Sequence, residues 1–271
     1  MNCTCNLCGG NDSKLLASIN AKPEGETSYL KEGTPYFREI RECNFCGVFF
    51  NCHEYDLFTK SFYEGQYNSA IDSAGLERRF KKIINLSSTE SDNKRRVARI
   101  KKFLGENGIG KDARVLDVGS GTGVFPYEMA SLGYKVSAVD PDPVSVKHMQ
   151  KHISVENTWE GSISDIPVLS FHLITFNKVL EHIQDPFELI NGAVKRLKEK
   201  GLIYIELPYG SDLVKDGLAT KRAEFFIEHF TTFTHEAFQF LADRAKLSCL
   251  QMNDLVDPSG KHTIYGFFRP K

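Results

Sequence analysis

A glycine-rich stretch at 115–123 contains the residues whose types and spacing point most clearly to chemistry. An apolar run that ends at Val118 leads directly into Gly119, Gly121 and Gly123. Glycine adopts positive φ at low cost and lets a ligand approach the backbone, and the N-terminus of a following helix presents free N–H groups to an anion. This order of strand, glycine turn and helix predicts a binding site for a nucleotide-type cofactor.

The spacing of the glycines distinguishes two kinds of cofactor fold. A dinucleotide fingerprint, G-x-G-x-x-G, would place its third glycine one residue later than Gly123. Together with Asp117 the glycines instead form D-x-G-x-G-x-G, and on this motif the chain resembles the class I S-adenosylmethionine (SAM) dependent methyltransferases. Segments 135–140, 171–186 and 201–208 match further strands and loops of that family, so the resemblance extends over residues 95 to 271.

The resemblance implies a set of cofactor contacts. Asp140 stands where the family places the acid that accepts hydrogen bonds from both ribose hydroxyls, which suits a carboxylate. The alternative is that Asp140 caps the helix after Pro141 or makes a turn. Where the family often has an acidic adenine contact this chain has Ser162 and Ile163, so adenine is expected to meet backbone groups and apolar atoms, with Asp165 a loop residue. The implied cofactor-binding residues are Asp117, Gly119, Gly121, Gly123, Asp140, Ser162, Ile163, Asn177 and Tyr63.

Lys178 is a departure from one branch of this family. Some quinone-type and RNA-end methyltransferases place there the first of two glutamates that, with a Glu-His pair, bind magnesium. In this chain the pair is Glu181 and His182, but the first glutamate is replaced by lysine. We therefore expect no catalytic metal.

Four of the seven cysteines form two C-x-x-C pairs, each followed by glycine. The pairs are Cys5 with Cys8, and Cys43 with Cys46. Two such turns present four thiolates, which are the donors of closed zinc sites, and four sulfurs leave no position open for water. We predict a structural Zn²⁺ that takes no part in the chemistry, in preference to disulfides or a redox pair. Cys3 and Cys52 are then spare thiols, Cys3 replaces Cys5 if the register is shifted, and Cys249 is an inert core residue.

The zinc site predicts a small N-terminal unit. Residues 1–55 are expected to form a zinc-binding β ribbon, with strands at 36–42 and 48–50 around the second cysteine pair. So short a segment buries too little apolar surface to fold without the metal. Residues 56–111 are expected to be a charged helical linker or lid, and residues 112–271 the methyltransferase domain.

Two tyrosines near the start of the linker, Tyr63 and Tyr67, have two interpretations. In similar enzymes a tyrosine-bearing segment folds over the cofactor as a lid, where the ring can cover a sulfonium face. Alternatively, both rings pack the helices together. The basic run at 94–103 has apolar residues at helical spacing, which favours a solvated helix face over a nucleic-acid patch.

Two histidines are candidates for proton transfer. Methyl transfer from a sulfonium is a direct displacement that depends on alignment, and a base is required only if the acceptor is protonated. His229 lies in a segment resembling the loop that lines the acceptor pocket of this family, and we predict it as general base, oriented by Glu228. His182 is the second catalytic candidate, and for both histidines the alternative is a purely structural role. Tyr209 and Asn177 are further candidates for the acceptor pocket.

The expected fold is α/β: a Rossmann-like sheet of seven mostly parallel strands with helices on both faces, an edge hairpin across 257–260, and the zinc ribbon. The net charge of −1 argues against a nucleic-acid partner. Because there is no long apolar run and no signal peptide near Met1, we expect a cytoplasmic protein without a membrane partner, whose oligomeric state is open.

The order of ribbon and methyltransferase domain resembles enzymes of sugar, polysaccharide and secondary-metabolite pathways. It implies a small-molecule acceptor, a nucleotide sugar, glycan precursor or related metabolite, methylated on O or N. An RNA or protein methyltransferase that grips its substrate with the ribbon is the second hypothesis. A SAM-binding assembly module without turnover is the third.

Overall fold

The computed structural model describes residues 3–55 and 73–271, and its larger sheet has seven strands in the order β10-β11-β8-β7-β4-β5-β6. The strands from β4 to β8 pair in parallel, whereas β11 is antiparallel to both β8 and β10. This is the predicted Rossmann-like fold with its edge hairpin. The strands are β4 (Arg114–Val118), β5 (Lys135–Asp140), β6 (Asn157–Glu160), β7 (Phe171–Asn177), β8 (Leu197–Pro208), β10 (Leu247–Val256) and β11 (His262–Pro270).

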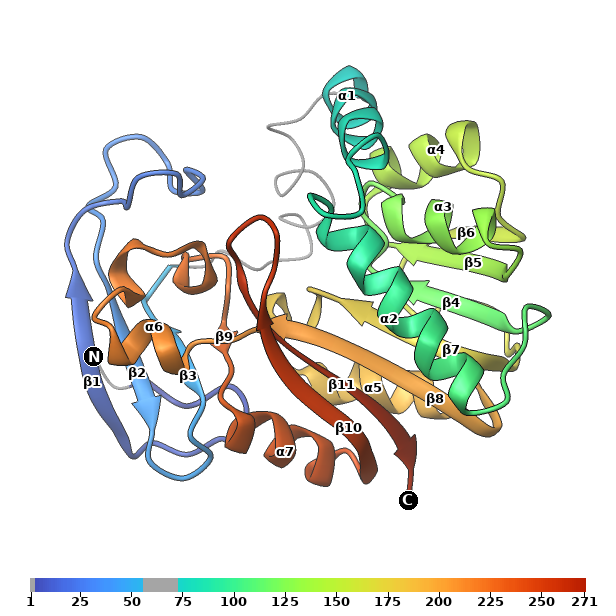
Figure 1. The fold of residues 1–271 in the computed structure, drawn as a ribbon. Helices are drawn as coiled ribbons and strands as arrows, with labels where there is room; N and C mark the ends of the chain where they lie inside the picture. Colours follow the sequence, from blue (N-terminus) through green and yellow to red (C-terminus); the bar gives the residue numbers. More distant parts are fainter. Residues whose placement is uncertain (1–2, 56–72) are drawn as a thin grey trace.

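Helices cover both faces of this sheet, as Figure 1 shows. On one face α2 (Asp92–Glu106) and α3 (Val124–Ser131) share a core with alternate residues of the central strands. Beside them α1 (Ser73–Ile84) packs on α4 (Pro143–His152) through Phe80 and Met149. The opposite face is covered by α5 (Pro186–Val194) and α7 (His235–Arg244). Burial on both faces explains why the parallel strands read as continuous apolar runs.

Short polar side chains cap the helices where the chain leaves the strands. Thr234 accepts a hydrogen bond from the amide of Ala237 and caps α7. The cap of α4 is Asp142, which accepts from the amides of Val144 and Ser145. Asp140 is therefore not the helix cap, but its Oδ1 accepts from the amide of Asp142 two residues on, so it does make a turn at the end of β5.

A second, smaller sheet contains strands from both ends of the chain, in the order β1-β2-β3-β9. Three of them belong to the N-terminal unit: β1 (Ser13–Ile19), β2 (Arg38–Cys43) and β3 (Phe49–Cys52). The fourth, β9 (Thr231–Thr232), comes from the segment after β8 and pairs antiparallel with β3. Figure 1 shows this segment, with α6 (Ser211–Lys215), lying against the N-terminal strands. The ribbon is thus completed by the second half of the chain.

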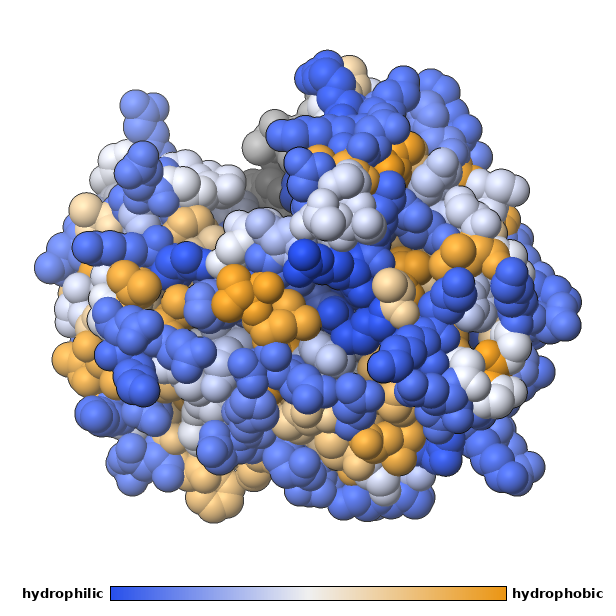
Figure 2. Space-filling view, viewed as in Figure 1, coloured by the Kyte–Doolittle hydropathy of each residue, from blue (hydrophilic) through white to orange (hydrophobic). Residues whose placement is uncertain are grey.

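Within the described residues no helix is long and apolar enough to span a membrane. The face shown in Figure 2 is mostly hydrophilic, with hydrophobic residues in small separate patches. The most exposed large apolar side chains, Val168 and Phe45, lie in separate loops, between β6 and β7 and between β2 and β3.

Candidate functional site

A pocket of about 730 Å³ opens at the carboxyl ends of β4, β5 and β7. Parallel sheets bind ligands at this edge, where the strand order changes direction. Of the residues predicted from sequence, the pocket is lined by Asp117, Gly119, Gly121, Asp140, Ser162, Asn177 and His182. Gly123, Ile163, Glu228 and His229 lie outside its lining. Tyr63 and Tyr67 lie outside the described residues.

The three glycines of the loop have different roles. All have positive φ, which glycine tolerates best. A Cβ on Gly123 would stand 2.2 Å from the Ile153 side chain, and one on Gly119 would stand 2.7 Å from Val179, so both glycines permit close packing. A Cβ on Gly121 would meet no protein atom within 4 Å. Gly121 therefore leaves room on its pocket side for a ligand.

Asp140 is held facing the pocket by two backbone amides. Its carboxylate accepts hydrogen bonds from Gly121 N at 2.7 Å and from Asp142 N at 2.9 Å. Burial raises the pKa of Asp140 to about 6, although the two amides act in the opposite direction. A carboxylate has about four lone-pair sites, so two remain for a ligand's hydroxyl groups.

Asp117 and Asn177 form the second polar group of the pocket. Asp117 accepts from Thr175 Oγ1 at 2.6 Å and from Asn177 Nδ2 at 2.7 Å, and burial raises its pKa to about 6. The other amide atom, Asn177 Oδ1, is buried and makes no hydrogen bond within the described structure. A buried acceptor beside a carboxylate fits the ammonium group of a methionine moiety, so these residues suit SAM.

The segment predicted to meet adenine is only partly in the pocket. Ser162 lines it, and its backbone N–H donates to Asp165 at 2.7 Å. Asp165 thus fastens the loop, in agreement with its predicted role. The Ile163 side chain is buried in the core under α5, where a Cβ on Gly192 would come within 2.7 Å of it. Any contact of Ile163 with adenine therefore has to come from its backbone.

The two histidines predicted as catalytic lie together although they are far apart in the sequence. Their ring centroids are 4.7 Å apart. His182 Nδ1 donates to the carbonyl of Glu228 at 2.9 Å, and His229 Nδ1 donates to the carbonyl of Glu224 at 2.9 Å. Since a carbonyl only accepts, both rings carry hydrogen on Nδ1. Burial lowers the pKa of His182 to about 4 and that of His229 well below its usual value, so both are neutral and Nε2 carries no hydrogen.

Glu228 does not take the position predicted for it. The group that bonds to His229 is the backbone of Glu224, whereas Glu228 orients His182 through its own carbonyl. The Glu228 carboxyl is largely buried, which raises its pKa to about 7, and its Oε2 makes no hydrogen bond within the described structure. It is therefore a partly buried acid, and the charged groups that act on its pKa include Glu26 and Arg38 of the ribbon.

Glu181, His182 and His229 could together hold a metal ion, because one ligand atom of each lies within 4.8 Å of the others. Burial raises the pKa of Glu181 to about 7, and Lys178 acts in the opposite direction. Lys178, in a left-handed backbone conformation with φ of 60°, donates through Nζ to Leu207 O and Thr263 Oγ1, each at 2.8 Å. The positive charge of Lys178 thus lowers the pKa of Glu181, as the charge of a bound cation would.

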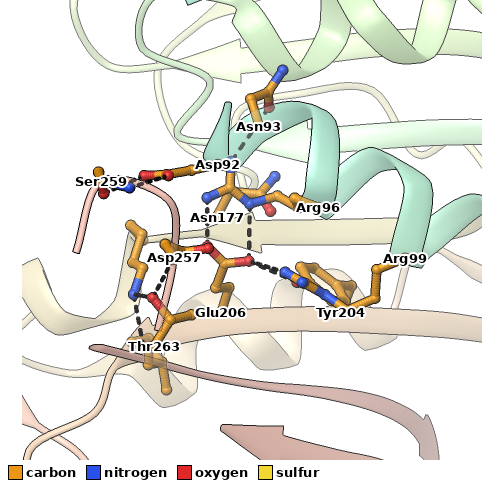
Figure 3. A network of polar contacts seen from close by, with 12 residues as sticks. Asp92, Asn93, Arg96, Arg99, Asn177, Tyr204, Glu206, Asp257, Ser259 and Thr263 are labelled. Carbon is orange, nitrogen blue, oxygen red and sulfur yellow. Dashed lines mark hydrogen bonds and ion pairs between the residues drawn. The ribbon is translucent and has the colours of Figure 1, made fainter. Parts of the chain in front are cut away.

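An ionic network connects this pocket with α2 (Figure 3). Arg96, which lines the pocket, pairs with both carboxylate oxygens of buried Glu206. Arg99 donates to Glu206 and to the Tyr204 hydroxyl, each at 2.9 Å. The expectation of a solvated face holds for exposed Arg95, Lys101 and Lys102, but it is wrong for Arg96 and Arg99, which turn inward. Nothing in the helical periodicity distinguishes them; their partner lies more than a hundred residues away.

The four predicted zinc ligands converge in the ribbon. Their four Sγ atoms lie within 4.8 Å of one another. The Sγ atoms of Cys5 and Cys46 are 3.6 Å apart, and those of Cys8 and Cys43 are 3.4 Å apart. Four sulfurs around one zinc at about 2.3 Å require similar separations. Gly9 and Gly47, at positive φ, turn the chain after each pair. The donor set therefore fits zinc.

Of the three remaining cysteines, two differ from the prediction. Cys3 and Cys52, expected as spare thiols, are joined in a disulfide with a Cα–Cα distance of 5.8 Å. Cys3 therefore does not replace Cys5 in the cluster. Cys249 is half-buried, and burial raises the pKa of its thiol, as expected for an unreactive cysteine.

Comparisons with known proteins show the family to which the chain belongs. The profile of a family described as "Methyltransferase domain" matches residues 89–252, more than half of the chain. A ubiquinone biosynthesis O-methyltransferase from Xanthomonas campestris pv. campestris is 36% identical over 101 residues, which are 34% of this chain and 42% of that protein. The mitochondrial ubiquinone biosynthesis O-methyltransferase of Schizosaccharomyces pombe is 29% identical over 101 residues, 34% of this chain and 36% of its own length. The match thus spans less than half of either relative.

Solved structures share the fold at low identity. Magnesium protoporphyrin IX methyltransferase from Synechocystis PCC 6803, with bound S-adenosylhomocysteine, has a TM-score of 0.58 and 12% identity, covering 79% of this chain and all (100%) of that one. The 1,6-didemethyltoxoflavin-N1-methyltransferase of Burkholderia thailandensis has a TM-score of 0.54 and 16% identity, and the match covers 93% of this chain and 100% of that one. With the glycine loop, the sheet order and the family match in agreement, the chain belongs to the methyltransferase-domain family and is a class I SAM-dependent methyltransferase.

Proposed function

We propose that this protein transfers the methyl group of SAM to an oxygen of a small-molecule acceptor. The observation that carries the proposal is that His182, in the Nδ1–H tautomer, lines the same pocket as Asp140 and the glycine loop. An acceptor hydroxyl and a cofactor can therefore share one cavity. The names of the curated relatives, both O-methyltransferases, favour oxygen over nitrogen.

Asp140, Asp117 and Asn177 would hold the cofactor. Asp140 has lone pairs left for the ribose hydroxyls, and Asn177 Oδ1 with Asp117 offers acceptors to the ammonium group. Gly121 allows the cofactor to lie against the backbone. SAM, when bound, supplies an electrophilic methyl group on sulfur. The protein's contribution is to fix the acceptor in line with that group and to keep water out.

The histidine pair would remove the acceptor's proton. His182 reaches the pocket, and His229 stands beside it with the same Nδ1–H tautomer. A neutral imidazole whose Nε2 carries no hydrogen can accept a proton from a hydroxyl. With a pKa lowered to about 4 by desolvation, His182 is a weak base, which favours an acidic hydroxyl such as a phenol or enol over a sugar alcohol. We therefore propose an acidic hydroxyl in place of the sugar acceptor expected from the domain order.

Zinc in the ribbon would be structural. Four thiols occupy every tetrahedral position, so no site is left for a substrate or for water. The metal would fix the ribbon, whose last strand belongs to the loop region after β8. A cytoplasmic location is part of the same proposal.

Transfer of labelled methyl from SAM tests the function. The purified zinc-loaded protein is incubated with SAM and four acceptor sets: phenols and enols, nucleotide sugars, RNA, and protein extract. We expect label in the phenol and enol set, with stoichiometric formation of S-adenosylhomocysteine. Label confined to RNA or protein would overturn the small-molecule proposal. S-adenosylhomocysteine binding without label in any set would favour a binding module.

A further inference from the structure

The loop that carries His229 is fixed from two directions. On the side of the large sheet, Phe230 N donates to the carbonyl of Glu181 at 2.7 Å. Within the loop, the Glu224 carbonyl accepts from His229 Nδ1 at 2.9 Å and from Thr232 Oγ1 at 2.6 Å. These bonds determine where the ring points only if the backbone of residues 224–230 is itself held in place. The other side of that backbone faces the N-terminal ribbon (Figure 1).

Asn51, on β3 of the ribbon, holds this backbone directly. Its side-chain Nδ2 lies 3.3 Å from the carbonyl oxygen of Phe225, 3.0 Å from that of Phe226 and 2.8 Å from that of His229. Its backbone N–H donates to Phe230 O at 3.2 Å. Two amide hydrogens serve three carbonyls, so at least one hydrogen is shared. One buried residue thus bonds to four backbone positions of the histidine loop.

A buried ion pair in the ribbon fixes Asn51 in turn. Arg38 donates to Asn51 Oδ1 at 2.5 Å and to Glu26 Oε2 at 3.0 Å. Glu26 Oε2 also accepts from the backbone N–H of Ile227 at 2.8 Å. The Arg38 and Glu26 side chains are 1% and 0% exposed, and neither lines the pocket. Burying such a pair is costly, and removing one partner leaves an unpaired buried charge. In this protein Glu26 bonds to the loop backbone directly, and Arg38 acts on it through Asn51.

We propose that the ribbon is a positioning element of the active site: Asn51, held by Arg38 and Glu26, fixes residues 224–230 so that the His229 ring meets His182. The proposal rests on the proposed function insofar as it takes the histidine pair to act on the acceptor. Asn51 is a positioning residue, because it acts through His229 and lies outside the pocket lining. It also gives a reason for one chain to carry both units: the ribbon's strand order includes β9, which follows the loop directly.

The test compares Asn51→Asp with Asn11→Asp in the full-length, zinc-loaded protein. The Asn51→Asp substitution keeps the shape of the side chain and removes its amide hydrogens. Asn11 is an exposed ribbon residue that accepts from Thr4 through Oδ1, which a carboxylate can also do. Long-range ¹H–¹⁵N spectra of ¹⁵N-histidine protein report which ring nitrogen carries hydrogen, and the chain has 8 histidines. His172 is an internal reference, because its Nδ1 accepts from Arg114 N.

We expect the Nδ1–H pattern of His229 to be lost or shifted in Asn51→Asp, with His172 unchanged and Asn11→Asp like wild type. Methyl transfer to the labelled acceptor set should fall by roughly 100-fold, the effect of a small misplacement, while S-adenosylhomocysteine affinity and zinc content are retained. Should Asn51→Asp fail to fold, Asn51→Ser removes the same amide donors without adding a charge.

An unchanged His229 pattern in a folded variant overturns the proposal, whatever the turnover. An altered pattern with normal turnover supports the positioning role and counts against the part of His229 in catalysis. The spectrum and the rate thus separate failure of this inference from failure of the proposed function.

Discussion

The carboxylates of the pocket are buried before any ligand binds. Burial raises the pKa of Asp140 and of Asp117 to about 6, although amides and hydroxyls around them act in the opposite direction. As a consequence of this arrangement, both groups take up protons in a mildly acidic solution. Because the predicted ribose and ammonium contacts need the ionised forms, binding and protonation compete.

The affinity for S-adenosylhomocysteine should therefore depend on pH. A ligand that prefers the ionised carboxylates binds fully above pH 6, and its affinity falls as the pH drops through the free-state pKa of about 6. The loss should be at least roughly tenfold per pH unit below that point. Calorimetric titrations between acidic and neutral pH measure it. Asp140→Ala should bind much more weakly at neutral pH, and equal affinity would remove the ribose contact.

The histidine pair offers a second prediction at this scale. His182→Ala and His229→Ala should each lower methyl transfer by roughly 10²- to 10⁴-fold, the range for loss of a general base, and leave S-adenosylhomocysteine affinity intact. His172→Ala is the matched control, because His172 lies near the start of β7, at the opposite end of the strand from the turn that carries His182. Full transfer by the His182 variant would contradict the assignment of the base.

Elements explain why these side chains meet at all. His182 follows β7 in a single turn of 3₁₀ helix, Leu180–His182, and His229 lies between β8 and β9. Parallel strands bring their carboxyl ends to one edge of the sheet, so residues that follow β4, β5 and β7 gather there. The ribbon contributes from outside this edge, through β3.

Loss of the zinc cluster should loosen the ribbon and the histidine loop together. Cys43→Ser removes one thiolate of the four, so the protein should contain less than one zinc per chain and melt at a lower temperature. Elemental analysis and thermal unfolding measure both. Cys249→Ser, outside the cluster, should retain zinc and melting temperature. If the Cys43 variant still contained a metal ion after loss of the cluster zinc, that ion would be assigned to Glu181, His182 and His229.

At the scale of the whole molecule, buried charges join parts that are distant in the sequence. Arg96 and Arg99 of α2 meet Glu206 at the end of β8 (Figure 3). Glu26, paired with Arg38, bonds to the loop that precedes β9. Burial alone would raise the pKa of Glu206, but Arg96, Lys178 and Arg99 outweigh it and hold that pKa below its usual range.

Glu206→Gln should therefore destabilise the fold strongly. It leaves two guanidinium groups without their carboxylate, and breaking a buried pair costs about 3–5 kcal/mol. Urea unfolding at neutral pH measures the change. Glu106→Gln is the control, since Glu106 and Lys102 form an exposed pair on the same helix. Equal midpoints for the two variants would contradict the prediction. The stability carried by Glu206 is present above its unfolded pKa and is lost as the pH falls through the lower folded one.

The sequence by itself determined the large sheet, the glycine loop and the cysteine cluster. Each depends on local spacing: buried runs form parallel strands, glycines at fixed intervals form the turn, and paired cysteines form thiolate turns. The family resemblance also predicted Asp140 and His182 as site residues, and the pocket contains both.

Only the tertiary structure decided which distant residues meet. The pairing of β9 with β3, the inward turn of Arg96 and the bonds from Asn51 to the His229 loop have no local signal, because each joins segments more than a hundred residues apart. The sequence also could not show which carbonyl orients each histidine, because every residue has a backbone carbonyl. Long-range contacts follow from how the two sheets pack, and a single sequence does not encode that packing as a pattern.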